Sequence, residues 1–387
     1  MRDYGAALRP LWTLDKSVRF LNHGSYGATP KALLEAQSRW RARMEAQPVR
    51  FMAELPGLLR DAATSCAAFV GVSPDRFAFV ENATAGVNSV VRSLCLSRGD
   101  EILTTDHVYG AVRQTLRHVA ATTGARLVEA PLGLPVASAG RIVDAIAQHI
   151  GKRTKLVVVD HIASPSAIVF PVREIVALCR DAGVPVLVDA AHAPGQVHLD
   201  VDALGADWCV GNFHKWLCAP KGAGFLAIAD RALPAIHPPV ISHGYGQGFA
   251  AEFDWIGTRD PTAWLCAPDA CAFHDDLGGE ALRRRNHTLV IEAAREIAWA
   301  LKSGLSAPEH MLGSMASVRV PGATPCDLPT ALRIHDLLLE RHAIEAPLVP
   351  FCGAMWIRIS AHAYNEAADY RGLGEALREI VAELAPG

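Results

Sequence analysis

Short apolar runs alternate with segments of helical periodicity along most of this chain. The runs typical of strands cover residues 77–80, 101–105, 126–129, 155–159, 184–188, 208–210 and 222–228. Between them, segments such as 87–94 repeat valine and leucine at the spacing of one helix face. This alternation predicts one large α/β domain around a mostly parallel sheet of the seven-stranded type.

The pattern changes after residue 228. Glycine-rich loops lead to two long helical patterns that end near residue 301. A second set of elements follows, with strands at 317–320 and 355–359, a helix at 328–342 and an amphipathic final helix. The expected regions are an N-terminal arm that contributes to the functional site (1–30), a large α/β domain (31–260), linking long helices (261–304) and a smaller C-terminal α+β domain (305–387).

Ionisable side chains follow two consecutive predicted strands. The run 184–188 ends in Asp189, and the run 208–210 leads into Asn212, His214 and Lys215. Because the carboxyl ends of parallel strands meet at one edge of a sheet, Asp189 and Lys215 should lie close together. An acid and a lysine suit a pyridine cofactor, since the acid keeps the ring nitrogen protonated and the amine forms a Schiff base. Taken singly, the acid is as easily a helix cap and the lysine a surface residue.

Three further positions have both a structural and a functional interpretation. Thr84 opens a helix after a strand, where free N–H groups suit a phosphate but a plain cap is common. Tyr109 follows another strand and could stack on a planar ring or simply pack. Arg358 stands between two isoleucines on a strand, and it invites a carboxylate from a ligand or from a structural ion pair.

The composition excludes several classes of function. The net charge is −3 and the pI about 6.6, so neither a nucleic-acid partner nor an acidic membrane surface is expected. No apolar run is long enough for a transmembrane helix, and the start of the chain lacks a signal-peptide core. The nine cysteines are scattered without a CxxC pair, which indicates reduced thiols in a cytoplasmic protein and no metal site.

Six motifs in this order carry a resemblance to a known family. They are LNHGSYG at 21–27, ENATAGVN at 81–88, DAAHAPG at 189–195, GNFHKWL at 211–217, GTRD at 257–260, and IRIS with a later YN at 357–365. The set resembles class V of the fold-type I pyridoxal-phosphate enzymes, and in particular the isopenicillin N epimerase-like group. The resemblance implies the fold-type I architecture described above and a homodimer whose active sites lie at the interface.

The resemblance also implies a role for each motif residue that faces the cofactor, pyridoxal 5'-phosphate. Lys215 would form the Schiff base, Asp189 would pair with the ring nitrogen, and His192 would lie near the ring hydroxyl. Tyr109 would stack on the ring. Ser164 would also lie near the ring hydroxyl, at a position where relatives often carry asparagine.

The remaining implied roles concern the phosphate and the substrate. The residues expected to hold the phosphate are Thr84, the amide of Ala85, Asn212 and His214, with Thr258 reaching the phosphate in the partner subunit. Arg358 would bind the carboxylate of an amino-acid substrate, with Asn22 or His23 assisting. In the sequence alone, Asn22 and His23 are equally consistent with an ordinary polar turn.

The family performs several reactions that begin with removal of the Cα proton by the freed lysine. An epimerase-like enzyme acting on an amino acid or small peptide is the first hypothesis, and a C–S lyase or an aminotransferase is the alternative. Epimerisation needs a second acid on the opposite face, for which Tyr109 and His23 are candidates. A cysteine desulfurase is disfavoured, because 344–350 lacks the nucleophilic cysteine and Cys352 lies only six residues before Arg358.

Two hypotheses from other classes stay open at this stage. One is a cofactor-bound scaffold or regulatory protein without turnover, for which Lys215 would be dispensable. The other is a nicotinamide dehydrogenase, which the glycines of SHGYGQGF at 242–249 do not support, because they lack the strand–turn–helix context of a dinucleotide fingerprint.

Overall fold

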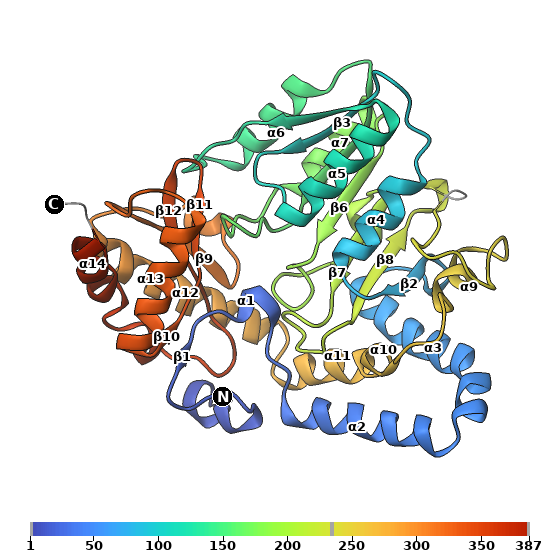
Figure 1. Cartoon of the computed structure of the whole chain (residues 1–387), viewed down its shortest axis with the longest axis horizontal. Coiled ribbons are helices and arrows are strands. Elements are labelled where there is room, and N and C mark those ends of the chain that lie inside the picture. The colour runs from blue at the N-terminus through green and yellow to red at the C-terminus, as the bar shows by residue number, and fades with distance from the viewer. Residues whose placement is uncertain (1–2, 233–235, 385–387) are drawn as a thin grey trace.

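A seven-stranded sheet forms the centre of the large domain in the computed structural model, which describes residues 3–232 and 236–384 (Figure 1). Its strand order is β2-β8-β7-β6-β5-β3-β4, with β8 antiparallel to both neighbours and the other pairs parallel. The strands span Phe77–Val80 (β2), Glu101–Thr105 (β3), Arg126–Ala130 (β4), Thr154–Asp160 (β5), Val186–Ala190 (β6), Trp208–Asn212 (β7) and Gly224–Ile228 (β8). The predicted sheet is confirmed.

The run 222–228 forms β8, the last strand of this sheet in chain order. β8 lies inside the sheet, between β2 and β7, and the edges are β2 and β4. An antiparallel neighbour needs no crossover helix, so the chain returns from β7 to β8 through the short segment 213–223. Lys215 lies on this segment, beside the carboxyl end of β7.

Helices cover both faces of the sheet, which explains why its strands are apolar runs rather than alternating patterns. On one face, α4 (Ala83–Ser93) and α5 (Gly110–Thr123) pack against alternate strand residues. The other face carries α3 (Pro48–Val70), α6 (Ala139–His149), α7 (Val172–Asp181) and α8 (Val201–Leu204). α2 (Lys31–Ala46) lies outside α3 and α10 (Thr262–Leu265), and α9 (Phe249–Asp254) lies beside β2.

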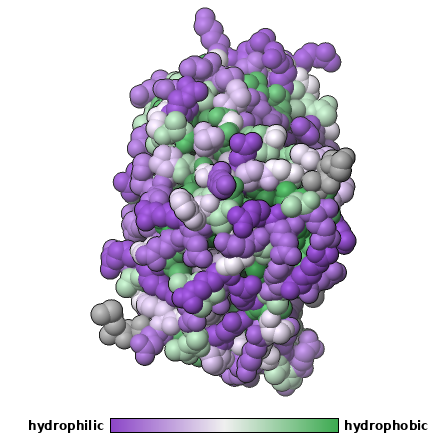
Figure 2. Space-filling view, turned by 90° about the vertical axis from the view of Figure 1, so that its left-hand side faces the viewer, coloured by the Kyte–Doolittle hydropathy of each residue, from purple (hydrophilic) through white to green (hydrophobic). Residues whose placement is uncertain are grey.

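The small domain has its own core, separate from that of the large domain. Its antiparallel sheet has the order β11-β12-β9, formed by Leu348–Phe351, Ala354–Ser360 and Met315–Val320. Helices α12 (Glu280–Leu301), α13 (Leu328–His342) and α14 (Leu373–Leu384) cover it. Figure 2 shows the side of the molecule that lies to the left in Figure 1, where this domain is; its surface is mainly hydrophilic, with apolar residues in scattered patches.

Of the segments between the two domains, some pack on the core of the large domain and others on the core of the small domain. Helix α11 (Ala267–Asp276) packs on α3 of the large domain, whereas α12 packs on α14 and β9 of the small domain. The N-terminal arm joins the small domain, because β1 (Arg19–Phe20) pairs in parallel with β10 (Ile344–Glu345). The next turn, α1 (His23–Tyr26), lies between the two domains in Figure 1.

Two expectations about the whole chain can be compared with the structure. Each of the nine cysteines is a free thiol, and Cys66, Cys179, Cys209, Cys218, Cys266 and Cys271 are buried. Within residues 3–232 and 236–384, no helix combines the length and apolar character that a bilayer span requires.

Candidate active site

A cavity of about 380 Å³ opens at the carboxyl ends of β5, β6 and β7. Eight of the residues singled out in the sequence line it: Thr84, Tyr109, Ser164, Asp189, His192, Asn212, His214 and Lys215. They come from five separate segments, which the parallel strand order brings to one edge of the sheet.

The amine of Lys215 faces a neutral imidazole. Lys215 Nζ lies 3.0 Å from His192 Nε2, and the indole N–H of Trp216 points to His192 Nδ1 at 3.4 Å. Because an indole only donates, Nδ1 accepts and the ring proton sits on Nε2, which then donates to an unprotonated amine. Burial lowers the pKa of Lys215 to about 8, against the opposing effect of Asp189, and it holds the pKa of His192 well below its usual range.

Two buried carboxyl groups lie side by side at this edge. Asp160 and Asp189 are register partners on β5 and β6, and each is about 3% exposed. Asp189 Oδ1 accepts a hydrogen bond from the N–H of Ala191 at 2.9 Å, whereas Oδ2 of Asp160 has no partner among the described residues. Burial raises the pKa of both groups, and the proximity of Asp189 raises that of Asp160 further. The pair therefore favours one ionised carboxylate, on Asp189, beside one neutral acid.

The N-terminus of α4 points its N–H groups toward the cavity, but two of them are already bonded. Asn82 caps the helix by accepting from Ala85 N–H at 3.0 Å, and Asn212 Oδ1 accepts from Ala83 N–H at 2.9 Å. The amide of Ala85 thus donates to the cap in this structure, and its expected role in holding a phosphate stays a prediction. Thr84 lines the cavity between these two bonds.

His214 and Tyr109 form the sides of the cavity around the lysine. His214 Nδ1 donates to the carbonyl of Ala223 at 2.9 Å, and burial lowers the pKa of this imidazole to about 4. The ring of Tyr109 lies 5.9 Å from Lys215 Nζ and is 42% exposed. A planar ligand bonded to the lysine would thus lie within reach of an aromatic face.

Arg358 reaches the same region from β12 of the small domain. One terminal nitrogen donates to the carbonyl and hydroxyl oxygens of Ser164 at 2.7 and 2.9 Å, and the other donates to Ser25 Oγ at 2.7 Å. Among the described residues no carboxylate pairs with this guanidinium, whose Nε is buried without a partner. Burial lowers its pKa to about 10. Arg358 therefore forms no structural ion pair with any of the described residues.

The other predicted residues lie outside the cavity. Asn22 acts one layer behind it: Asn22 Oδ1 accepts from the Ser25 hydroxyl at 2.5 Å, and its amide donates to Glu345 at 2.9 Å. His23 is buried beneath the lysine segment and contacts its backbone, so it does not assist Arg358 directly. Thr258 is exposed on the loop after α9 and is not among the residues that line this cavity.

Sequence reasoning missed six residues that line the cavity, and four of them carry polar side chains: Ser25, Tyr26, Asn82 and Asp160. Asp160 directly follows the apolar run 155–159, in the same way that Asp189 follows its own run. The place of Asp160 directly after a predicted strand was the sequence feature that could have indicated an acid at the site. Ser25 and Tyr26 belong to the LNHGSYG motif, but spacing alone does not show which side of a short turn faces a ligand.

Comparison with known proteins decides the family. The family model for "Aminotransferase class-V" matches residues 25–373, which is most of the chain. The chain belongs to this family. It is accordingly a pyridoxal-phosphate-dependent enzyme, and the resemblance inferred from the motifs is confirmed.

Individual relatives cover nearly the whole chain. A protein of Oryza sativa subsp. japonica provisionally named L-cysteine desulfhydrase 1 is 35% identical, over 95% of this chain and 84% of the relative. Isopenicillin N epimerase of Amycolatopsis lactamdurans is 34% identical, over 95% and 96%. Among solved structures, the apo cysteine desulfurase from Thermococcus onnurineus matches with a TM-score of 0.82 at 20% identity, over 99% of both chains, which shows the shared fold.

The side chains present fit a pyridoxal-phosphate cofactor. A carboxylate for the ring nitrogen, an amine for the aldehyde and a helix N-terminus for the phosphate all meet at one cavity, with an aromatic ring at its side. The guanidinium of Arg358 donates to Ser164 and Ser25 of the cavity lining but has no carboxylate partner among the described residues, and a substrate carboxylate would supply one.

Proposed function

We propose that this enzyme cleaves a C–S bond of a small sulfur-containing α-amino acid by β-elimination. The observation that carries the proposal is the buried amine of Lys215 at the cavity, 3.0 Å from His192 Nε2, and the whole-length similarity to proteins named L-cysteine desulfhydrase supports it. One base is sufficient for elimination, because the proton taken from Cα can be returned to the departing thiolate. In this proposal, Arg358 binds the α-carboxylate of the substrate.

The roles of the site residues follow from their contacts. Arg358, held by Ser164 and Ser25, binds the substrate carboxylate with two parallel N–H donors. Asp189 stays ionised beside the ring nitrogen, and Thr84 with the α4 N-terminus holds the phosphate. When bound, the cofactor supplies an electron-accepting ring that takes up the electron pair left at Cα.

Proton transfer rests on Lys215 and its neighbours. Its amine is unprotonated near neutral pH more often than an ordinary lysine, because burial lowers its pKa to about 8. His192 donates to this amine from Nε2 and thereby orients its lone pair. Lys215 removes the Cα proton, the C–S bond breaks, and the resulting ammonium protonates the thiolate. Hydrolysis of the remaining enamine gives a 2-oxo acid and ammonia.

A persulfide route through an enzyme cysteine is not proposed. Residues 344–350 carry no cysteine, and Cys352 lies exposed on the turn between β11 and β12, outside the cavity. Although Cys352 is exposed overall, partial desolvation of its thiol and the nearby carboxylate of Asp106 raise its pKa to about 11, which makes it a poor nucleophile.

The test is an assay of the purified holoenzyme with L-cysteine, L-cystine and related thioether amino acids. The expected result is release of equal amounts of a 2-oxo acid, ammonia and the leaving sulfur compound, which is sulfide from L-cysteine, a thiol from a thioether and a persulfide from L-cystine. This release should be lost in Lys215→Ala. Inversion of optical rotation at unchanged mass, without 2-oxo acid, would replace elimination by epimerisation.

Epimerisation is the second candidate, and two observations favour it. Isopenicillin N epimerase relatives match over 95–96% of both chains, and the phenol side chain of Tyr109 lines the cavity with its ring centroid 5.9 Å from Lys215 Nζ. The other candidate acid, His23, does not reach the cavity. Epimerase activity would therefore depend on Tyr109, and Tyr109→Phe should abolish inversion while keeping exchange of the Cα proton with solvent.

A further inference from the structure

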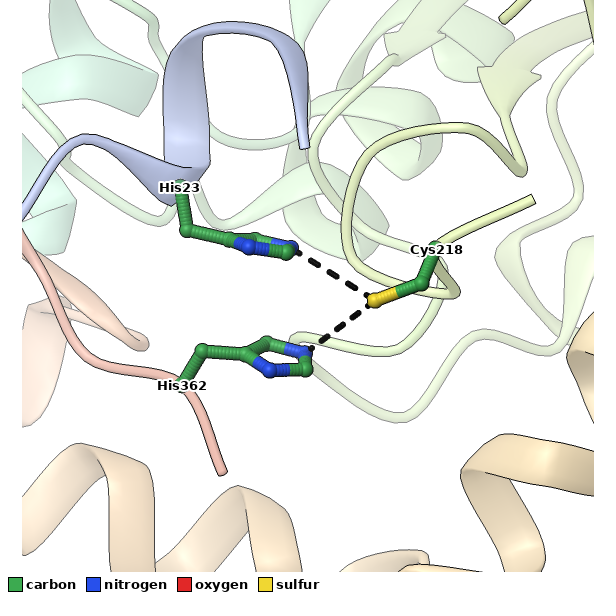
Figure 3. A group of neighbouring side chains, drawn as sticks. All are labelled: His23, Cys218 and His362. Carbon is green, nitrogen blue, oxygen red and sulfur yellow. Dashed lines mark hydrogen bonds between the residues drawn. The ribbon is translucent and has the colours of Figure 1, made fainter. Parts of the chain in front are cut away.

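Beneath the lysine segment lies a fully buried cluster of His23, Cys218 and His362 (Figure 3). The thiol of Cys218 lies 3.8 Å from His23 Nε2 and 3.6 Å from His362 Nε2. The three residues come from α1, from the segment after β7 and from the segment after β12. None of them lines the cofactor cavity.

The ring geometry argues against a metal at this cluster. A metal bound to two imidazoles lies about 2 Å from each nitrogen and in the plane of each ring. Here the two rings are stacked, with centroids 4.0 Å apart and planes inclined by 17°, so the planes do not meet near the nitrogens. Nε2 of His23 is also occupied, since it lies 3.0 Å from the carbonyl oxygen of Lys215.

The contacts of His23 define its tautomer. A carbonyl oxygen only accepts, so Nε2 carries the proton and donates to the carbonyl of Lys215. Nδ1 then accepts from the hydroxyl of Tyr364 at 2.8 Å. Burial lowers the pKa of His23 to about 3, so the ring stays neutral and this arrangement is retained across the working pH range.

The same carbonyl also accepts from the backbone N–H of Cys218 at 3.1 Å, so two donors hold the Lys215 peptide plane. The N-terminal arm approaches this segment closely at Gly27, whose added Cβ would lie 2.3 Å from the carbonyl oxygen of His214. His362 stacks under His23 and keeps its ring in place.

We propose that His23 is a positioning residue for Lys215, which orients the catalytic amine by donating from Nε2 to the Lys215 carbonyl. Tyr364 and His362, which follow Arg358 on the same segment of the small domain, hold His23 in turn. Two residues further along α1, Ser25 holds Arg358. A single turn thus positions both the lysine and the carboxylate-binding arginine. The inference rests on the proposed role of Lys215, but not on which sulfur substrate is used.

The test compares His23→Phe, which keeps the stacked ring but removes both nitrogens, with His23→Gln, whose amide nitrogen can replace Nε2 as donor. In His23→Phe, kcat should fall by about tenfold or more, while KM should change by no more than about twofold. The reason is that the variant misorients the Lys215 amine but keeps the contacts that bind the substrate. The pH midpoint of the visible absorbance band of the resting holoenzyme should shift. His23→Gln should restore most of both quantities.

His274→Phe is the matched control, because His274 is equally buried and also bonds a backbone carbonyl, that of Gly195. It should lower the melting temperature without moving the spectral midpoint. If His23→Phe fails to fold, Tyr364→Phe provides the same test with a smaller shift, since it removes the donor that fixes the tautomer.

A wild-type midpoint and kcat in His23→Phe, or an equal shift in His274→Phe, would overturn the inference. Failure of the proposed function looks different. In that case wild type releases no 2-oxo acid, whereas the midpoint shift of the His23 variants persists.

Discussion

The charges of Asp189, Asp160 and Arg358 act on the amine of Lys215. Together with burial, they determine the pKa of this amine. Burial lowers its pKa to about 8, Asp189 and Asp160 oppose that change, and Arg358 adds to it. In the cofactor-free protein, acylation of Lys215 should therefore rise with pH through a midpoint near 8. Asp189→Asn should lower this midpoint, because it removes an anion that stabilises the ammonium form, and Arg358→Leu should raise it.

Mass spectrometry of peptides after timed acylation measures this prediction, with the exposed Lys31 on the same chain as the reference. The expected result is a midpoint near 8 for acylation of Lys215. A midpoint near the ordinary lysine value of about 10.4, or a rise in the Asp189→Asn variant, would contradict the electrostatic account.

Arg358 should determine affinity for the substrate carboxylate. Replacing it by alanine removes two charge-assisted hydrogen bonds, each of which contributes about 1.5–3 kcal/mol. Because about 1.4 kcal/mol corresponds to a factor of ten, KM for an amino-acid substrate should rise by a factor of about 100 or more. Binding of the corresponding amine without the carboxylate, followed by absorbance, is the control and should not change. Equal losses for both ligands would indicate that Arg358 is structural.

The sequence predicts a site residue best when that residue directly follows a strand. Asp189 and Lys215 were found because each follows an apolar run, and the sheet then determines where they lie. The amide of Ala85 was expected to bind phosphate, and sequence spacing does not show that Asn82 also offers this N–H an acceptor. His23 turned toward the lysine backbone because its side-chain direction depends on tertiary packing.

At the scale of elements, the short turn α1 and the segment after β7 fit against each other through Gly27. This residue has a φ of +69°, and an added Cβ would lie 2.3 Å from the His214 carbonyl oxygen and 2.7 Å from that of Lys215. Gly27→Ala should therefore cost more than backbone strain alone, on the order of 2–4 kcal/mol in the free energy of unfolding.

Gly133→Ala is the matched control for Gly27→Ala. Gly133 has a similar φ of +64°, but a Cβ there would meet no atom within 4 Å. It should cost only the strain of a left-handed residue, about 1–2 kcal/mol. Denaturant unfolding of both variants gives the comparison. Equal losses would show that the contact between α1 and the lysine segment does not contribute to stability.

The elements themselves were largely predictable, and the exceptions have physical causes. Helix 328–342 coincides with α13, since a capping aspartate before it and a histidine at its end delimit it. The position of β8 between β2 and β7 was not predicted, because the local sequence pattern does not show which strands become neighbours. The linking region 261–304 divides between two cores because α11 and α12 bury their apolar faces on different domains.

At the scale of the whole molecule, both domains contribute residues to the site, and part of the cavity lining is exposed to solvent. Tyr26 is 76% exposed, and Thr258 lies outside the cavity of its own chain. We propose that the enzyme is a homodimer in which Thr258 contacts the phosphate bound in the partner subunit. Thr258→Val should then weaken cofactor affinity while leaving the sedimentation coefficient of the dimer unchanged. A monomer with full cofactor affinity would contradict this proposal.

The central claim is that Lys215 anchors the cofactor and performs the proton transfer. The most direct test is the visible absorbance spectrum of wild type, Lys215→Ala and the neighbouring control Lys221→Ala after incubation with pyridoxal phosphate. Lys221 lies on the same segment but outside the cavity. The account predicts a visible band for wild type and Lys221→Ala that Lys215→Ala lacks, and a change of this band when a sulfur amino acid is added. A wild type that stays colourless, or a band that Lys215→Ala retains, would contradict it.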